Sequence, residues 1–426
     1  MRRGWLILAM LVSGAQAAEP STTLTLETVL AHAEAPHPDL DLARARQSAA
    51  QAEQQLSESL NDFRVSLEGT LRSGRNDSYN DRFHPDNQAR LNARKVLFDA
   101  GRLDSGIAAA REEADARDLQ LLDTRAQRRL TLMARYFDAL LADMQYAADT
   151  EFMAVAYVNW DNAKDRRDLG QMPQWELAEL ESRYLDSRTR RNDVVRKLRD
   201  KRMQLGLALN RAEPVKEDLV DPKLADNDRP LPELAPLLDA MLAHNPRLQA
   251  QKQMLAAARN RIEGVRADNR PSLEFEAEAA SWSRQASTRD DVRAGLNFVW
   301  PLWQGGRIDA RMAREQAVFQ ERQAQYDKLQ QELRQSLADT WEEIHYLRDS
   351  ERRGGDANAH YRELALEKAR AEYEMELKTN LGSSMAETQT AHLRLRAVEY
   401  RLALALARLE ALLGTSLESV KVENKK

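Results

Sequence analysis

The stretch that decides the fold occurs twice: residues 89–104 read ARLNARKVLFDAGRLD, and residues 294–309 read AGLNFVWPLWQGGRID. In both copies, apolar residues alternate with others before the glycines and recur at helical spacing after them. Alternation is the period of a strand, and a spacing of three to four residues is that of a helix. Each copy therefore predicts a strand, a tight turn and a long helix. The residues of the two predicted strand-to-helix turns are Phe98, Gly101, Arg102, Trp303, Gly305, Gly306 and Arg307.

A duplicated plan extends over the rest of the chain. Pro38 interrupts a predicted helical segment near the start, and Pro246 interrupts another in the second half. Proline ends or bends a helix because it lacks the backbone N–H and clashes with the preceding turn. The same order of elements in both halves predicts a two-fold internal repeat. We expect a first repeat over residues 18–211, a proline-rich linker over 212–233 and a second repeat over 234–418.

Two β-hairpins are predicted from the alternating segments that lead to the turns, at about residues 62–98 and about 271–303. Alternation alone fits a half-buried sheet of a soluble domain equally well. Two details favour strands that cross a membrane. The alternating runs have about nine to eleven residues, which a tilted strand needs to span a bilayer. Aromatic residues (Phe98, Trp300 and Trp303) gather at the turns, as they do where a barrel wall meets the membrane surface.

Four strands per chain are too few for a closed membrane barrel, because about eight is the smallest number known. An open sheet edge in lipid leaves backbone N–H and C=O groups unpaired, at several kcal/mol each. If these strands span a membrane, they must close with strands of other copies. Three copies would supply twelve strands, enough for a transmembrane β-barrel with a watery interior.

Long helices are predicted after both β-hairpins. Residues 103–167 contain no proline and a single glycine, and one helix of this length would reach roughly 90–100 Å at 1.5 Å per residue. We expect two antiparallel helical hairpins, over about residues 102–210 and about 306–413. The pair Gly354–Gly355 is expected to kink or break the second one, and Gly414 is expected to cap the last helix.

The predicted fold class is mainly α with a small β part. Shorter helices precede each β-hairpin, from Asp41 to about Leu60 and from Gln249 to Arg266. The chain of 426 residues has only 16 glycines and 13 prolines and is rich in Ala, Leu, Glu, Arg and Gln. Such a composition is typical of long packed helices.

The first residues predict export from the cytoplasm. Arg2 and Arg3 precede a short apolar run, and Ala15-Gln16-Ala17 offers a cleavage site, so residues 1–17 are predicted to be a signal peptide. The run is too short to cross a bilayer as a helix. The chain has no cysteine, which excludes disulfides and cysteine-based metal sites. Residues 419–426 are expected to form a disordered tail.

The sequence contains no catalytic signature, neither a nucleophile elbow, nor a phosphate-binding loop, nor a zinc-protease motif. Its seven histidines are scattered, and its carboxylates lie among Arg and Lys on predicted helix faces, where solvated ion pairs are the usual outcome. We therefore expect no enzyme activity, no cofactor and no metal site. The basic segment Arg188–Arg202 lacks interleaved aromatic residues, and the net charge is -5, so nucleic acid is not an expected partner.

The order of these features resembles the TolC family of outer-membrane efflux factors. The resemblance rests on the duplication, the breaks at Pro38 and Pro246, and the turns Leu97–Arg102 and Leu302–Arg307. It implies a homotrimer in which long helices form an α-helical barrel, topped by a twelve-stranded transmembrane β-barrel with four strands per chain. It places the protein in the cell outer membrane of a Gram-negative bacterium, in contact with outer-membrane lipid and extending into the periplasm.

The resemblance also implies a role and partners. The trimer would be the passive exit duct of a tripartite efflux pump or a type I secretion system. Its partners would be a periplasmic adaptor, or membrane fusion, protein and an inner-membrane pump of the RND, ABC or MFS type. The alternative from another class is a soluble periplasmic coiled-coil adaptor or structural spacer with a small β-domain. Several helical hairpins and two distant strand pairs favour the duct.

The far ends of the two long helical hairpins are where members of this family dock adaptors and close the channel. The matching positions are Leu169, Gly170 and Gln171 in the first half, and Met375, Glu376 and Leu377 in the second, followed by Lys378 where a basic gating residue is expected. The family usually has a glycine at both tips, and Glu376 departs from this pattern. The aspartate ring of well-known members is not matched here, because its positions fall near Gly382 and Met385.

Overall fold

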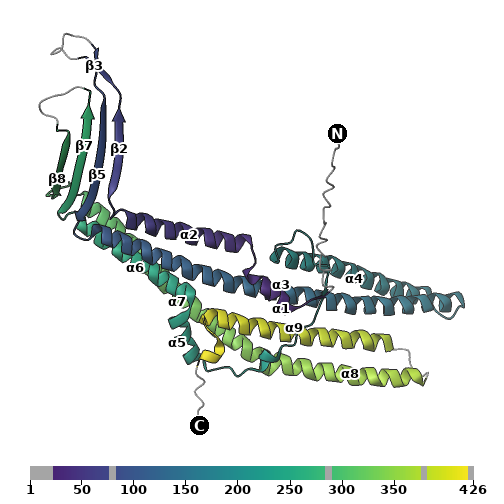
Figure 1. The fold of residues 1–426 in the computed structure, drawn as a ribbon. Helices are drawn as coiled ribbons and strands as arrows, with labels where there is room; N and C mark the ends of the chain where they lie inside the picture. The colour runs from purple at the N-terminus through teal and green to yellow at the C-terminus, as the bar shows by residue number, and fades with distance from the viewer. Residues whose placement is uncertain (1–22, 76–82, 284–289, 376–380, 421–426) are drawn as a thin grey trace, which may run out of the picture. The chain divides into compact units, whose positions relative to one another are not determined.

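The structure is a computed structural model that describes residues 23–75, 83–283, 290–375 and 381–420 (Figure 1). The predicted signal peptide, residues 1–17, and the end of the predicted tail lie outside these residues. The described chain divides into two compact units. Residues 23–32 and 135–223 are called the hairpin unit, and the other described residues the sheet unit. These units do not coincide with the two predicted repeats, whose boundaries stay a prediction.

One four-stranded antiparallel sheet contains both predicted β-hairpins. Its strands, in order across the sheet, are β2 (Arg64–Thr70), β5 (Gln88–Phe98), β7 (Ser272–Trp282) and β8 (Val292–Val299). The two hairpins join through the pairing of β5 with β7, which alternation in the sequence did not indicate. A small extra hairpin extends the first loop and pairs β3 (Ser73–Arg75) with β4 (Phe83–Pro85).

The two prolines of the duplicated plan stand at the first position of helices, α2 (Pro38–Ser59) and α6 (Pro246–Ala267). Both helices begin three residues earlier than the predicted starts, because proline at the first position needs no N–H partner and has a helical φ. The residue before each proline caps the helix. The Asn245 side chain accepts a hydrogen bond from the amide of Leu248 at 3.0 Å.

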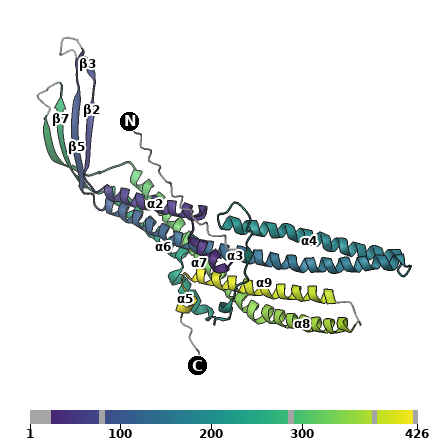
Figure 2. The same cartoon turned by 45° about the vertical axis from the view of Figure 1, so that its right-hand side comes forward.

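The core of the sheet unit is an apolar cluster to which α5 (Leu234–His244), α7 (Arg307–Tyr346) and α9 (Leu381–Leu413) all contribute. Helix α8 (Arg353–Glu374) runs beside α9 in both views (Figure 1, Figure 2). The spacing of three to four residues predicted in these segments places one stripe of each helix in the cluster. Fully buried members include Leu237, Met241, Leu337, Ile344, Leu402, Leu409 and Leu413.

The expected break at Gly354–Gly355 is wrong. Both glycines lie within α8, and the irregular turn comes just before it, where Leu347–Arg352 form a π-helical segment between α7 and α8. Gly355 faces α9, where a Cβ atom would lie 3.3 Å from the Leu395 side chain. The missing side chain of Gly355 therefore allows close packing of α8 on α9. Gly414 ends α9 at φ 70°, the left-handed conformation of a C-cap.

The hairpin unit consists mainly of two antiparallel helices. Helix α3 (Arg102–Asp168) has 67 residues, starts in the sheet unit and ends in the hairpin unit, and α4 (Gln174–Ala208) returns along it. The predicted helix over residues 103–167 is thereby confirmed. The unit also contains α1 (Leu26–Ala31) and the parallel strands β1 (Thr23–Leu24) and β6 (Asp218–Leu219). Short 3₁₀ turns lie at His32–Glu34, Ala225–Asp228 and Leu417–Ser419.

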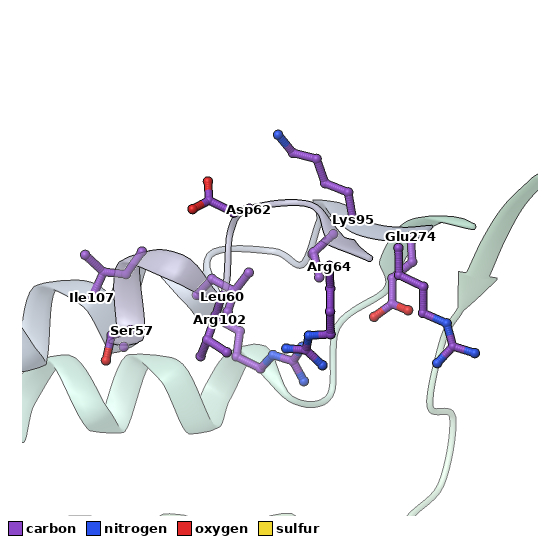
Figure 3. A pocket seen from close by; sticks show the side chains of 12 residues that line it. Ser57, Leu60, Asp62, Arg64, Lys95, Arg102, Ile107 and Glu274 are labelled. Carbon is purple, nitrogen blue, oxygen red and sulfur yellow. The ribbon is translucent and has the colours of Figure 1, made fainter. Parts of the chain in front are cut away.

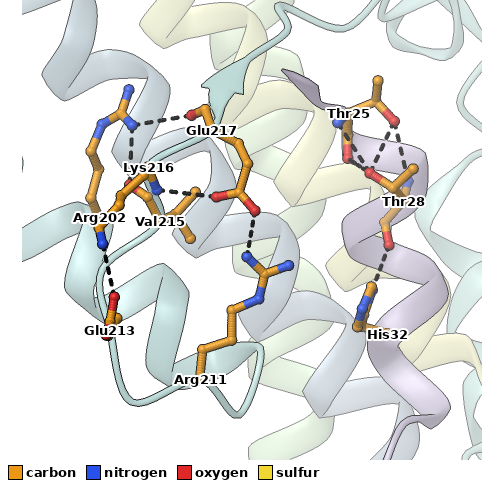
Figure 4. A network of polar contacts seen from close by, with 9 residues as sticks. All are labelled: Thr25, Thr28, His32, Arg202, Arg211, Glu213, Val215, Lys216 and Glu217. Carbon is orange, nitrogen blue, oxygen red and sulfur yellow. Dashed lines mark hydrogen bonds and ion pairs between the residues drawn. The ribbon is translucent and has the colours of Figure 1, made fainter. Parts of the chain in front are cut away.

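The linker is more firmly packed than an extended connector. Arg202 of α4 donates to the carbonyl oxygens of Val215 and Glu217, both at 3.1 Å, and pairs with the Asp143 carboxylate of α3 at 2.8 Å. Val215 is buried, and Glu217 forms a further hydrogen bond with Arg211 at 2.6 Å (Figure 4). These contacts satisfy backbone carbonyl groups that regular structure leaves open here.

The Arg211–Glu217 pair makes a testable contribution to stability. The hydrogen bond from Arg211 holds the pKa of the Glu217 carboxyl below its usual range. A carboxyl with a lowered pKa in the folded state stabilises the fold above its unfolded pKa and loses this effect as the pH falls through its folded pKa. We expect Arg211→Gln to lower the free energy of unfolding by about 0.5–1 kcal/mol at pH 7. Urea unfolding should show this difference shrinking below about pH 4, and an equal difference at pH 7 and pH 3 would contradict the assignment.

Candidate functional site

The four-stranded sheet has one polar face and one apolar face, and the pairing of its strands fixes both. Because side chains alternate along a strand, residues opposite one another in the register lie on the same face. One row across the apolar face contains Leu67, Leu91, Ala279 and Val292. The polar face contains Arg64, Ser66, Glu68, Thr70, Gln88, Arg90, Asn92, Arg94, Glu274, Glu276, Glu278, Arg293 and Asn297.

The apolar face is uncovered by any described part of the chain. Leu67 is 76% exposed and Val292 is 75% exposed, and Leu296 and Phe298 are exposed as well. Water-soluble proteins rarely leave an apolar surface of this extent open, so such a face indicates an interaction with lipid or with another protein. Among the paired residues of the four described strands, the only charged side chain on this face is Lys95, near the helical end, whose ammonium lies 5.0 Å from the Phe63 ring centre.

The polar face bears charges of both signs on neighbouring strands. Arg94 on β5 lies 3.4 Å from Glu276 on β7, and Arg293 on β8 lies 2.7 Å from Glu278. The arginines of both pairs are well exposed, so each pair adds little to stability. What the face provides is a hydrated, charged surface directly behind an apolar one.

The first predicted turn joins β5 to α3. Ala100 and Gly101 have φ values of 59° and 88°, so the chain reverses through two left-handed residues. The Asp99 carboxylate accepts hydrogen bonds from the amides of Gly101 at 3.1 Å and Leu103 at 2.7 Å. Asp99 thus caps α3, a role that alternation and glycine spacing did not reveal. Phe98 is exposed at the end of β5, and Arg102 is the first residue of α3.

The second predicted turn joins β8 to α7. Gly305 and Gly306 have φ values of 62° and 74°, which a side chain would strain, and Arg307 follows as the first residue of α7. Trp303 is 88% exposed, as is Leu71, and no large apolar side chain among the described residues is more exposed. The predicted residues of both turns therefore lie where β-structure ends and helix begins.

Asp268, just after α6, lies close to residues that follow both turns. Its carboxylate pairs with Arg311 of α7, and Arg102 of α3 lies 3.9 Å away. The Gln304 side chain donates to the Asp268 carbonyl oxygen at 3.3 Å. Reasoning from sequence missed Asp268, because its partners are distant along the chain and the corresponding place in the first half is an apolar Leu60.

Two cavities lie beside the strand-to-helix turns, and the region around them is called the junction. One, with a volume of about 540 Å³, is lined by Ser57, Leu60, Asp62, Arg64, Lys95, Arg102, Ile107 and Glu274, among others (Figure 3). The other, of about 470 Å³, includes Asp99, Asp268, Arg270, Arg307 and Arg311. In both, basic side chains outnumber acidic ones. Within the residues that the structure describes, no group of three potential ligand side chains could hold a metal ion.

Removal of the Asp268 carboxylate tests its part in the junction. Asp268→Ala leaves Arg311 without its partner, and we expect a loss of about 1–3 kcal/mol in the free energy of unfolding. Glu263→Ala, near the end of the helix that Asp268 follows, is a matched control, because the ion pair of Glu263 with Arg266 is half exposed. We expect this variant to change the free energy of unfolding by about 0.5 kcal/mol or less. Urea unfolding measures both variants. Equal losses in the free energy of unfolding for both variants would show that Asp268 stabilises the fold no more than a half-exposed ion pair does.

The predicted tip residues are only partly placed. Leu169, Gly170 and Gln171 form the turn between α3 and α4, where Gly170 has φ 74° and the amide of Gln171 donates to the Arg166 carbonyl oxygen at 2.8 Å. Leu169 is 70% exposed at this turn. Glu376, Leu377 and Lys378 lie outside the described residues. No helix among the described residues has both the length and the apolar composition to cross a membrane.

Known proteins resemble this chain in part of its sequence and in its fold. Residues 237–415 match the family model of the outer membrane efflux protein. A search of curated proteins gave no match.

Solved structures with this fold include several channels. CusC has a TM-score of 0.75 and 19% identity, with 92% of both chains covered. VceC of Vibrio cholerae has a TM-score of 0.73 and 17% sequence identity, and the match covers 92% of this chain and 96% of that chain. The CmeC outer membrane channel of Campylobacter jejuni has a TM-score of 0.75 and 15% sequence identity, and the match covers 91% of this chain and 85% of that chain. At these identities the likeness shows the fold.

The match of residues 237–415 supports the predicted resemblance to outer-membrane efflux factors and the predicted location in the outer membrane. The predicted mainly helical fold with a small β part is confirmed as well. Residues 237–415 therefore match the family model of the outer membrane efflux protein, and the chain as a whole has the fold of the solved channels.

Proposed function

We propose that three copies of this chain form an outer-membrane channel that serves as a passive exit duct for export. The single observation that carries the proposal is the two-faced sheet. Its apolar face suits lipid, its charged face suits a water-filled pore, and its outer strands β2 and β8 pair on one side only within the described chain. No described segment of the protomer covers the apolar face or pairs with the open edges of β2 and β8.

Closure by a trimer follows from the physics of backbone groups in lipid. Unpaired N–H and C=O groups on β2 and β8 would cost several kcal/mol each in hydrocarbon, so both edges need partners. Three sheets of four strands give a twelve-stranded barrel, within the range known for outer-membrane barrels and wide enough for a watery interior. The two-fold internal repeat and the barrel of long helices below it are parts of the same proposal.

The helical part would extend the pore into the periplasm. Helix α3 alone has a length of roughly 100 Å at 1.5 Å per residue. We assign the tips, with Leu169, Gly170 and Gln171 on one and Glu376, Leu377 and Lys378 on the other, to contact with a periplasmic adaptor and to closure of the channel. An inner-membrane pump of the RND, ABC or MFS type would supply the energy, since the chain has no nucleotide-binding loop. Opening would come from a shift of the helix pair from about Ile308 to Leu413 against its neighbours when the adaptor binds.

A conductance measurement in planar lipid bilayers tests the proposal. The purified protein should insert and give discrete single-channel currents that rise with salt concentration. Pore-facing Glu276→Lys and Glu278→Lys should shift the preference of the channel from cations toward anions. Insertion without any current, or currents with unchanged selectivity in both variants, would contradict a pore lined by the polar face.

The alternative of a soluble periplasmic adaptor or spacer meets a difficulty in the same sheet. An adaptor in water would leave the row of Leu67, Leu91, Ala279 and Val292 exposed. Cell fractionation separates the two readings, because the channel requires detergent for release whereas an adaptor without an anchor appears in the periplasmic extract.

A further inference from the structure

Closure of the barrel depends on the edge strands β2 and β8. Two independent alignments of the first half of the chain with the second half indicate how these strands pair. Resting on the proposed trimer, we propose that β8 of one copy pairs antiparallel with β2 of the next copy in one register, with Asn297 opposite Thr70 of the neighbouring copy. The same register places Phe298 opposite Gly69 and Val299 opposite Glu68 of that copy.

The first match comes from the helices before the hairpins. Helices α2 and α6 both have 22 residues and both begin with proline, so Pro38 corresponds to Pro246. Arg64 lies as many residues after Pro38 as Ser272 lies after Pro246, so Arg64 corresponds to Ser272. These are the first residues of β2 and β7. Helix length and strand start thus agree on one alignment of β2 with β7.

The second match comes from the turns after the hairpins. Arg102 and Arg307 are the first residues of α3 and α7, so they correspond. Followed backward, Arg94 corresponds to Val299, and Asn92 corresponds to Asn297. The observed hairpins connect the two matches: Arg64 lies opposite Arg94, and its counterpart Ser272 lies opposite Val299. Matches taken from different parts of the chain therefore give the same alignment.

The pairing of β5 with β7 then serves as a template for the seam between copies. In that pairing Asn92 lies opposite Glu278. Because β5 corresponds to β8 and β7 to β2, a ring of six equivalent hairpins repeats the same pairing between β8 of one copy and β2 of the next. At the seam between copies, Asn297 occupies the position of Asn92, and Thr70 of the next copy occupies the position of Glu278. The join inside a chain and the join between chains become equivalent.

The side chains support this register over its neighbours. It keeps Asn297 and Thr70 on the polar face and Phe298 and Gly69 on the apolar face, whereas a slip of one residue would bring polar side chains into lipid. A slip of two residues keeps the faces but moves Phe298 from Gly69 to Leu67 or Leu71. An aromatic ring opposite a glycine covers the backbone that the glycine leaves open, so the proposed register alone uses Gly69.

Disulfide crosslinking tests the register directly, because the natural chain has no cysteine. Residues directly opposite in an antiparallel pair have Cα atoms about 4.5–5.5 Å apart, within the reach of a disulfide. Diagonal neighbours are about 7–8 Å apart and are not. Asn297→Cys with Thr70→Cys in one chain should therefore give, on mild oxidation in outer membranes, a covalent trimer on a denaturing gel without reductant.

Three further double variants complete the experiment. Asn92→Cys with Glu278→Cys is the matched control inside the chain, and it should crosslink without an increase in mass. Asn297→Cys with Glu68→Cys, and Asn297→Cys with Arg72→Cys, represent slips of two residues. We expect each to crosslink at least tenfold more slowly than the pair with Thr70→Cys.

Faster crosslinking with Glu68→Cys or Arg72→Cys would overturn the register while leaving the trimeric barrel standing. Absence of every crosslink between copies, with the Asn92–Glu278 control closed, would overturn the barrel itself. Failure of the control would show that the pairing of β5 with β7 is not the template, and the proposed register would fall with it.

Discussion

Leu67→Arg should abolish most assembly of the trimer in the outer membrane. Leu67 lies in the middle of β2 on the apolar face and is 76% exposed in the protomer, so an arginine there costs the isolated chain little. In the proposed barrel the same side chain faces hydrocarbon, where arginine near mid-bilayer costs about 2–4 kcal/mol in each copy. With three copies in one barrel, the effect should be large. The measurement is the fraction of heat-labile trimer in outer-membrane extracts on a semi-native gel.

Ser66→Arg is the control that distinguishes the two faces. Ser66 is the preceding residue on the same strand and lies opposite Asn92 on the polar face, so its arginine would lie in the watery pore. We expect trimer yields close to those of the natural chain. Normal assembly of Leu67→Arg, or an equal loss in both variants, would show that Leu67 does not face lipid.

Gly414→Ala should destabilise the sheet unit strongly. Gly414 has φ 70°, and a Cβ atom there would collide with the carbonyl oxygen of His244 and lie 3.0 Å from the Pro246 ring. A left-handed conformation costs a residue with a side chain about 1–3 kcal/mol, and overpacking against rigid backbone adds about 1–3 kcal/mol. We expect a loss of roughly 2–5 kcal/mol in the free energy of unfolding, measured with urea in detergent.

Gly106→Ala provides the opposite expectation for the same substitution. Gly106 lies within α3, and a Cβ atom there meets nothing within 4 Å. Alanine is the better helix former by about 1 kcal/mol, so this variant should be unchanged or slightly more stable. A stable Gly414→Ala variant would mean that the end of α9 does not pack on the start of α6 as described.

Local patterns in the sequence predicted the elements well. The alternating segments before the turns became β2, β5, β7 and β8, because a period of two separates the faces of a strand wherever it lies. The predicted helix over residues 103–167 agrees with α3, since no proline and only one glycine interrupt it. The glycines of both turns adopt left-handed conformations, which few other residues tolerate.

Contacts between distant segments were not predictable from one sequence. Alternation shows which residues share a face but not which strand is the neighbour, so the pairing of β5 with β7 was missed. Nothing in the sequence distinguishes Asp268 from the many other carboxylates of the chain, because its partner Arg311 is distant along the chain. The prolines of the linker did not indicate how it packs: Asn227 within it is buried and donates to the Glu399 carboxylate at 2.6 Å.

The mass of the particle released from outer membranes by detergent is the most direct test of three-fold barrel closure. Native mass spectrometry should find three copies of a chain whose unprocessed mass is 48.5 kDa, with no stable species of one or two copies. A folded single copy that stays in solution without detergent would contradict the account, because its apolar face and both sheet edges would then need neither lipid nor a second chain.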